Sequence, residues 1–298
     1  MEAMFYKTVA ELVKTAEQRK CPISTIVLEN QVENTELTLD ELLKQMDKNW
    51  SVMVEAMERG LNEEVRSVSG LTGGDAKKLY QAHLSGSSPL SGGPVMETVA
   101  RALAVAEVNA AMGRIVAAPT AGSCGVVPAV VYTVANLRGN SRSDIVKALF
   151  TAAGFGMIIA YNASISGAEG GCQAECGSAS CMAAAAAVEL AGGTPVQAAH
   201  AGAIALKNVL GLVCDPVAGL VEVPCIKRNA MAAANAMVAA DLALSGIESR
   251  IPIDEVIGAM KEIGKSMPAT LKETACGGLA NTPTARLLER QLFEAYEE

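Results

Sequence analysis

The feature that most constrains this chain is a succession of alanine-rich segments separated by short polar connectors. The clearest segment is CMAAAAAVEL, residues 181–190. Alanine has the highest intrinsic helix propensity because it loses no side-chain entropy in a helix. We therefore predict alanine-rich helices over about 95–113, 126–138, 142–160, 177–191, 195–209, 228–246 and 252–265. More charged helices are predicted over about 4–19, 37–59 and 284–297.

Residues that favour strands are scarce, which favours an all-α fold. Aromatic residues make up 3% of the 298 residues, whereas apolar residues make up 50%. The core must therefore be built from Ala, Val, Ile, Leu and Met, without the aromatic side chains that are enriched in strands. We predict a single compact multi-helix catalytic domain over residues 1–298, with residues 1–60 as a helical segment packed on it.

Charge and hydropathy argue against two classes of partner. The net charge is −8 and no long run of Lys and Arg is present, so no nucleic-acid partner is expected. The longest apolar stretch, IVKALFTAAGFGMIIAYNASI, is interrupted by Lys147, Gly154 and Gly156. Because a spanning helix needs about 20 unbroken apolar residues, we expect a buried helix there and no membrane partner. The N-terminus lacks a signal-peptide layout, and we expect a cytoplasmic protein.

Two stretches of the N-terminal half depart from the helical pattern. We expect extended or irregular backbone in PISTIVLENQVEN, residues 22–34. The zone from 70 to 93 is rich in Gly and Ser, and its Ser87, Ser88 and Ser91 are candidates for one wall of a substrate site.

The connectors between the predicted helices share a polar character. They are AAPTAGSCG (117–125), YNASISGAEGGC (161–172), GLVCDPVAG (211–219) and CGGLANTPT (276–284). Glycine lets backbone approach a ligand closely, and small hydroxyl residues offer hydrogen bonds. Rigid helices that present such loops to one region are the usual layout of an active site.

The eight cysteines are not expected to form disulfides, because the cytoplasm keeps thiols reduced. Structural zinc fits poorly, since CQAECGSASC has one C-x3-C pair and no second pair, and the C-x2-C-x2-C run of ferredoxins is absent. Cys21 and Cys181 are expected to be small buried apolar residues. The roles of Cys124, Cys176 and Cys276 stay open.

Cys172, Cys214 and Cys225 form the most interesting set of thiols. Each lies at a helix-breaking Gly or Pro, in GGCQ, VCDP and VPCI. Thiolate ligands need backbone amide donors around the sulfur, and non-helical backbone supplies them. Spacing alone makes these three residues candidate ligands without establishing them as such.

Several long motifs extend this set. They are NASISGAEGGCQAE, GLVCDPVAGLVEVPCIKRNA and APTAGSCGVVPAV, together with LTGGDAKKL and GGLANTPT. These motifs resemble the α chain of the iron–sulfur L-serine dehydratases, and the resemblance covers nearly the whole chain. It implies an oxygen-sensitive [4Fe–4S] enzyme that deaminates L-serine to pyruvate and ammonia without pyridoxal phosphate. It implies that Cys172, Cys214 and Cys225 hold the cluster and leave one iron open as a Lewis acid for the substrate hydroxyl.

The substrate carboxylate needs a fixed partner. Thr120, Gly122 and Ser123 in PTAGS are candidates for a carboxylate cradle at a helix start, and a plain turn is the alternative. Lys227 and Arg228 follow the third cysteine and could offset the charge of the cluster, with Arg228 gripping the carboxylate bidentately. Surface charge at a helix start is the alternative for this pair.

A second group of polar residues precedes the first cysteine. Asn162, Ser164, Ser166 and Glu169 are candidates for orienting the ammonium group or the cluster, although a solvated surface glutamate is the alternative for Glu169. Asn109 lies in a helix otherwise full of Ala and Val and is a buried polar residue that needs a partner.

The sequence does not reveal the general base. His83 and His200 both lie in segments where structural roles are the better interpretation. The resembled family is split into α and β chains, with a β-like domain at the N-terminus of its single-chain members. We therefore expect a β chain as partner and the base to come from it.

Three rival interpretations remain. A pyridoxal-phosphate lyase would need an α/β scaffold, and its alternation of strands and helices is absent. A cysteine desulfidase-type lyase, in which the open iron takes sulfide in place of hydroxide, stays open. So does a non-catalytic helical scaffold with incidental cysteines.

Overall fold

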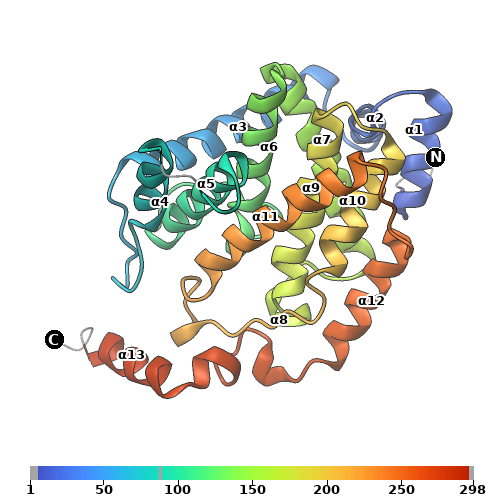
Figure 1. Cartoon of the computed structure of the whole chain (residues 1–298). Coiled ribbons are helices and arrows are strands. Elements are labelled where there is room, and N and C mark those ends of the chain that lie inside the picture. Colours follow the sequence, from blue (N-terminus) through green and yellow to red (C-terminus); the bar gives the residue numbers. More distant parts are fainter. Residues whose placement is uncertain (1–5, 87–88, 295–298) are drawn as a thin grey trace.

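The chain folds into a bundle of helices around one central helix (Figure 1). The structure is a computed structural model that describes residues 6–86 and 89–294. Within these ranges there is no strand, only two isolated bridges, so the all-α prediction is confirmed. The longer helices are α1 (Val9–Arg19), α2 (Ile23–Asn34), α3 (Leu39–Asn62), α4 (Asp75–Leu84), α5 (Gly93–Ala110), α6 (Val126–Arg138), α7 (Arg142–Asn162), α9 (Ser178–Leu190), α10 (Pro195–Lys207), α11 (Cys225–Leu244), α12 (Ile253–Ser266) and α13 (Pro283–Glu294). The short ones are η1 (Ala121–Ser123), α8 (Gly167–Gly170), η2 (Gln173–Gly177), η3 (Val217–Gly219), η4 (Ala269–Leu271) and η5 (Gly278–Asn281).

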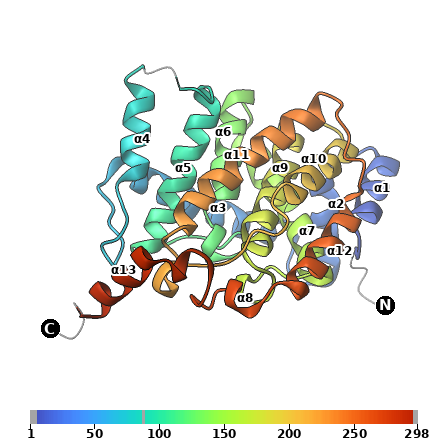
Figure 2. The ribbon, with the colours of Figure 1, turned by 60° about the horizontal axis from the view of Figure 1, so that its bottom comes forward.

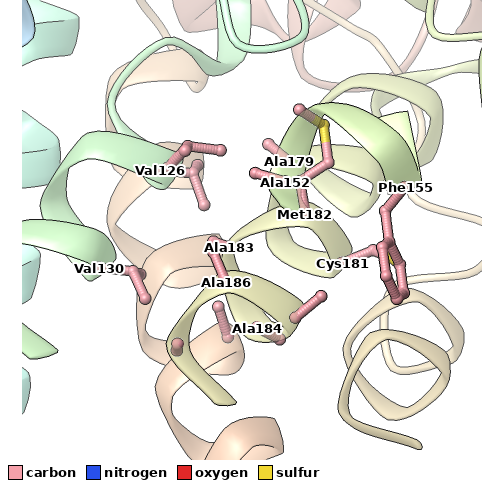
Figure 3. Close-up of a cluster of buried hydrophobic side chains, with 14 of the residues drawn as sticks. Val126, Val130, Ala152, Phe155, Ala179, Cys181, Met182, Ala183, Ala184 and Ala186 are labelled. Carbon is pink, nitrogen blue, oxygen red and sulfur yellow. The ribbon is translucent and has the colours of Figure 1, made fainter. Parts of the chain in front are cut away.

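Helix α9 forms the centre of the bundle. It packs against α6, α7, α10 and α11 (Figure 1), and its side chains from Ser178 to Val188 are all buried. A helix that is apolar on every side is stable only when other elements surround it. Its alanines let these neighbours come close, and Figure 3 shows Val126 of α6 and Phe155 of α7 beside it. The alanine-rich run therefore becomes the core of the protein.

Helix α7 is the long apolar helix predicted to be buried. It is long and apolar enough to cross a membrane by composition, but 61% of its most apolar window is buried inside the protein. It packs against α2 on one side and α9 on another. This burial agrees with the core helix predicted from the sequence.

The prediction of extended or irregular backbone over residues 22–34 is wrong, because this stretch forms α2. Ile23, Ile26 and Val27 are buried, and Val27 packs so closely on Gly154 of α7 that a Cβ there would lie 2.6 Å from the Val27 Cγ2. Burial against α7 outweighs the modestly lower helix propensity of these β-branched residues.

The Gly/Ser-rich zone contains a helix that the sequence reading did not separate from it. Helix α4 begins at Asp75, where the carboxylate of Glu107 accepts hydrogen bonds from the backbone N–H groups of Asp75 (2.8 Å) and Ala76 (3.3 Å). Ser91 is exposed, and Ser87 and Ser88 lie outside the described residues. The proposed serine wall therefore stays a prediction.

The N-terminal helices pack on the rest of the bundle. Helix α1 contacts α10 and α12, α2 contacts α7, and α3 contacts α5 and α7. The N-terminal end of the described chain lies beside α1, on the opposite side of the molecule from α13 (Figures 1 and 2). The assignment of the whole chain to one domain stays a prediction.

Candidate active site

The three cysteines of the candidate site lie on segments that meet on the side of the bundle carrying α8 and α13 (Figure 2). Cys172 immediately precedes η2, a π-helical turn. Cys214 lies in the loop before η3, and Cys225 is the first residue of α11. Cys172 and Cys214 are buried, whereas Cys225 is half-buried. Single-turn π-helices occur frequently at functional sites.

The thiols are close enough to act on one another electrostatically. Burial raises the pKa of the Cys214 and Cys225 thiols, and the negative charge of Cys172 raises each of them further. A hydrogen bond from Cys176 lowers the pKa of Cys172, and the positive charge of Arg228 contributes in the same direction. Without a bound cation, three thiolates here would repel one another.

Gln173 joins the first cysteine segment to the second. It is fully buried. Its backbone N–H donates to the Leu212 carbonyl (3.0 Å), and its side-chain oxygen accepts from the Gly211 N–H (2.9 Å). The residue after Cys172 therefore fixes the backbone that leads into Cys214.

Arg228 joins the third cysteine segment to the second. Its Nη1 donates to the Val213 carbonyl at 2.7 Å, and its Nη2 donates to the Asp215 Oδ1 at 2.8 Å. The Asp215 Oδ2 accepts in turn from the Leu279 N–H at 2.7 Å. Two arms of the guanidinium that was predicted to grip the substrate carboxylate are thus bound within the chain, on either side of Cys214.

The C-terminal segment holds Cys214 by its backbone. The Cys214 N–H donates to the Leu271 carbonyl (2.9 Å), and the Cys214 carbonyl accepts from the Glu273 N–H (2.7 Å). This pair of bonds forms an isolated parallel bridge. The second cysteine is therefore fixed through both its amide and its carbonyl.

Asn229 joins the third cysteine segment to the PTAGS loop. Its Oδ1 accepts from the Gly125 N–H (2.9 Å), and its Nδ2 donates to the carbonyls of Gly122 (2.7 Å) and Cys225 (3.0 Å). Ser123 is buried within this loop. The structure thus brings the predicted loop together with the segment of Cys225, through an asparagine for which we predict no role from the sequence.

Glu175 is the functional side chain that the sequence reading missed. Its Oε1 accepts a hydrogen bond from the Thr120 hydroxyl at 2.7 Å, and its Oε2 lies 3.9 Å from the Cys214 Sγ. A Cβ added to Gly122 would lie 2.9 Å from Oε1, and one added to Gly167 would lie 2.5 Å from Oε2. Burial raises the pKa of Glu175, and the hydrogen bond from the Thr120 hydroxyl acts in the opposite direction. The loop predicted to cradle the substrate carboxylate therefore contacts a carboxylate of the protein itself.

The polar group before Cys172 has other partners. The Asn162 side chain donates to the Lys7 carbonyl at 2.7 Å. The Ser164 hydroxyl accepts from the Ser166 N–H at 3.1 Å, and Glu169 is exposed. No contact with substrate follows from these bonds, and the substrate-binding roles of Asn162, Ser164 and Ser166 stay predictions.

Lys227 lies apart from the cysteines. Its Nζ pairs with the Asp75 carboxylate at 2.5 Å, and its side chain is 60% exposed. It therefore ties α11 to the start of α4 and is not positioned like its neighbour Arg228. His200 accepts a hydrogen bond from the Ser249 N–H at its Nδ1, which agrees with a structural role.

A cavity of about 610 Å³ lies beside the PTAGS loop. Ala121 of this loop, Asn109 of α5 and Phe293 of α13 are among its lining residues. Asn109 is half-buried, so it is less enclosed than the sequence predicted.

Comparison with known proteins identifies the family of this chain. Residues 18–280 match the protein family described as "Serine dehydratase alpha chain". The chain is 57% identical over 288 residues to a "Probable L-serine dehydratase, alpha chain" of Bacillus subtilis, a match covering 97% of this chain and 95% of that protein. It is 44% identical over 287 residues to the "L-serine dehydratase, alpha chain" of Peptoniphilus asaccharolyticus, covering 96% and 98%.

Longer relatives match as well. The chain is 42% identical over 281 residues to an "L-serine dehydratase" of Streptomyces coelicolor, covering 92% of this chain but 60% of that protein. A protein called "L-serine dehydratase 1" in Escherichia coli matches at 41% identity over 281 residues, with 92% and 61% coverage. Proteins similar to this chain thus occur both at its own length and as part of a longer polypeptide.

Proposed function

The chain belongs to the serine dehydratase alpha chain family, and on that premise we propose that it deaminates L-serine to pyruvate and ammonia as the α chain of an iron–sulfur enzyme. The observation that carries the proposal is the meeting of Cys172, Cys214 and Cys225 from three separate segments of the chain. The reaction itself is supported by the names of the relatives.

Cys172, Cys214 and Cys225 would hold a [4Fe–4S] cluster. The donor set fits such a group, because burial and neighbouring negative charge raise the pKa of two of the thiols and bound iron keeps thiolates deprotonated. Within the described residues, no three His, Cys, Asp or Glu side chains are arranged to hold a single metal ion. When bound, the cluster would supply a Lewis-acidic iron that eases departure of the substrate hydroxyl.

The chain's own residues hold the site in place before any ligand enters. Arg228 keeps a positive charge near Cys172 and Cys225, and its bonds to Asp215 and the Val213 carbonyl prevent it from turning away. Sites that need no rearrangement during reaction bind and react more efficiently. We therefore assign to Arg228 the offsetting of thiolate charge, and direct contact with the substrate carboxylate becomes secondary.

We assign the general base to a partner chain. Removal of the α-proton needs a group within hydrogen-bond reach of the substrate, whereas His200 accepts a hydrogen bond from the Ser249 N–H and His83 lies beside the ring of Tyr80. Several relatives are named as α chains, which supports a two-chain enzyme with a β chain. Loss of the α-proton and the hydroxyl group, which together make one water, leaves an enamine that tautomerises to an imine, and water hydrolyses this imine to pyruvate and ammonium. We also propose a cytoplasmic location, where the thiols stay reduced.

The test is pyruvate formation from L-serine by this chain co-expressed with its β chain and purified without oxygen. Cys214→Ala should abolish activity and lower the iron content, whereas Cys181→Ala, which removes a buried thiol of the α9 core, should retain both. Activity that survives air, or a fully active Cys214→Ala protein, would contradict the cluster assignment. Sulfide release from L-cysteine without pyruvate formation from L-serine would favour the desulfidase alternative.

A further inference from the structure

Glu175 lies among the predicted ligands without being one of them. It is in the π-helical turn that follows Cys172, and its carboxylate lies against the PTAGS loop, Gly167 and Cys214. Two of these neighbours are glycines whose Cβ atoms would collide with the carboxylate oxygens. The surrounding backbone therefore leaves space for this side chain in this place, and the residue remains partly accessible.

The surroundings of Glu175 contain no cation that is paired with it. Among the residues that the structure describes, no Lys, Arg or His forms an ion pair with Glu175 within 4.0 Å, and the negative charge of a second acid, Glu273, also acts on it. The neighbouring Arg228 is already paired with Asp215. A carboxylate in a partly buried site gains most from a charged donor, because charge-assisted hydrogen bonds are about twice as strong as neutral ones.

Building on the proposed function, we infer that Glu175 binds the ammonium group of the amino-acid substrate. L-serine carries one cation, its α-ammonium group, and that group has three N–H donors of the kind this carboxylate lacks. The Thr120 hydroxyl donates to Oε1 and so holds the carboxylate in one orientation toward the substrate. The PTAGS loop therefore serves the amino end of the substrate, which reverses the carboxylate cradle predicted from its sequence.

This assignment makes Glu175 a specificity residue for α-amino acids over the corresponding hydroxy acids. A ligand that lacks the ammonium group leaves the carboxylate without a charged partner, and a site built for such a partner discriminates strongly against the analogue that lacks it. L-serine and 3-hydroxypropanoate, which is serine without its amino group, form the matched pair of ligands for the test.

The experiment uses the two-chain enzyme, purified without oxygen, with iron content and visible absorbance recorded for every variant. Glu175→Gln should raise the KM for L-serine, and the Kd of L-alanine measured by calorimetry, by about 10- to 100-fold, the range for a lost charge-assisted hydrogen bond. The Ki of 3-hydroxypropanoate should change by less than about threefold, because this ligand makes no such bond. Glu175→Asp, which keeps the charge, should preserve most of the preference for the ammonium-bearing ligand.

The matched control is Glu255→Gln, which removes an exposed acid of α12 away from the cysteine segments and should change the KM by at most about threefold, since exposed charges are screened. If Glu175→Gln weakened the binding of the ammonium-bearing ligand and of 3-hydroxypropanoate equally, the assignment would be overturned. An unchanged KM for L-serine would overturn it as well. If Glu175→Gln loses its iron, the assignment is judged instead from the Glu175→Asp variant and from the preference of the wild-type enzyme for the ammonium-bearing ligand. A wild-type enzyme that binds propanoate, which is L-alanine without its amino group, as tightly as L-alanine also refutes it. Absence of pyruvate formation by the wild type refutes the proposed function alone, because the calorimetric preference is measured without turnover.

Discussion

Two adjacent basic residues, Lys227 and Arg228, should differ sharply in what their removal does to stability. The Arg228–Asp215 pair is buried, with side chains 14% and 4% exposed, whereas the Lys227–Asp75 pair is 60% and 39% exposed. Removing one partner of a buried ion pair leaves an uncompensated charge and typically lowers the free energy of unfolding by about 3–5 kcal/mol. An exposed pair contributes about 1 kcal/mol or less. Arg228→Met should therefore destabilise the protein severely, and Lys227→Met only slightly.

These free energies translate into melting temperatures. With an unfolding entropy of about 2.1 cal/mol/K per residue, the 298 residues give about 0.6 kcal/mol per kelvin. Arg228→Met should then lower the Tm by about 5–8 °C, and Lys227→Met by less than about 2 °C. Both methionine side chains keep much of the apolar length of the original residue, so the comparison isolates the charged group.

The assay is thermal unfolding of cluster-free protein under reducing conditions, followed by circular dichroism at one scan rate. Cluster-free protein is needed because altered iron binding would otherwise change the Tm through ligand linkage. Equal losses of Tm in the two variants would refute the reasoning, because burial would then not determine how much an ion pair contributes to the free energy of unfolding. A double variant, Arg228→Met with Asp215→Leu, should recover part of the loss, since it removes the uncompensated carboxylate as well.

Two further predictions concern a buried acid and two glycines. Burial raises the pKa of Glu189 above the ordinary glutamate value of 4.5, so its contribution to stability is present below about pH 4.5 and is lost as the pH rises through the raised value. In urea unfolding, the wild type should therefore lose stability relative to Glu189→Gln as the pH rises from 4.5 to 8, and a constant difference would contradict the prediction. Gly258→Ala, on α12 where an added Cβ meets nothing within 4 Å, should raise the free energy of unfolding by about 0.5–1 kcal/mol in the same assay. Gly167→Ala, whose Cβ would collide with Glu175, should instead reduce kcat/KM for L-serine by more than about tenfold. Equal kcat/KM values for L-serine in the two alanine variants would show that the close approach of Glu175 to Gly167 does not affect catalysis.

The alanine-rich run shows why much of the fold was predictable. Small helix-forming residues on all sides of one segment leave few arrangements other than a surrounded central helix, and α9 is that helix. The failure over residues 22–34 has the opposite cause. Nothing local in that sequence reveals that Ile26 and Val27 pack against α7, and this packing decides the conformation of α2.

The candidate site also has parts that could be predicted from the sequence and parts that could not. Cysteines at Gly and Pro breaks could be recognised because their chemistry and their motifs are local. Glu175 was overlooked as a spacer between Cys172 and Cys176, and nothing in the sequence places it against Thr120, 55 residues away. The acid inside a cysteine cluster was nevertheless a usable signal, since a carboxylate there has an electrostatic cost that calls for a reason.

Arg228 illustrates a different limit of sequence reasoning. Its charge and its position after Cys225 are evident in the sequence, but its partners within the chain are not, because an arginine binds whichever acceptors the fold presents. Asp215, which directly follows Cys214, supplies that acceptor. A buried ion pair within the chain and a clamp on the substrate carboxylate look the same in sequence.

Each cysteine segment carries its own side chain that braces it to another part of the site. Gln173 follows Cys172 and binds the loop that leads to Cys214. Arg228 and Asn229 follow Cys225 within one helical turn and bind the Cys214 loop and the PTAGS loop. None of these braces uses a thiol sulfur, so the segments are held together independently of whatever the sulfurs bind. The arrangement therefore explains how three thiols whose negative charges repel one another can stay close together before positive charge arrives, since the energy that holds them there comes from hydrogen bonds and burial around them.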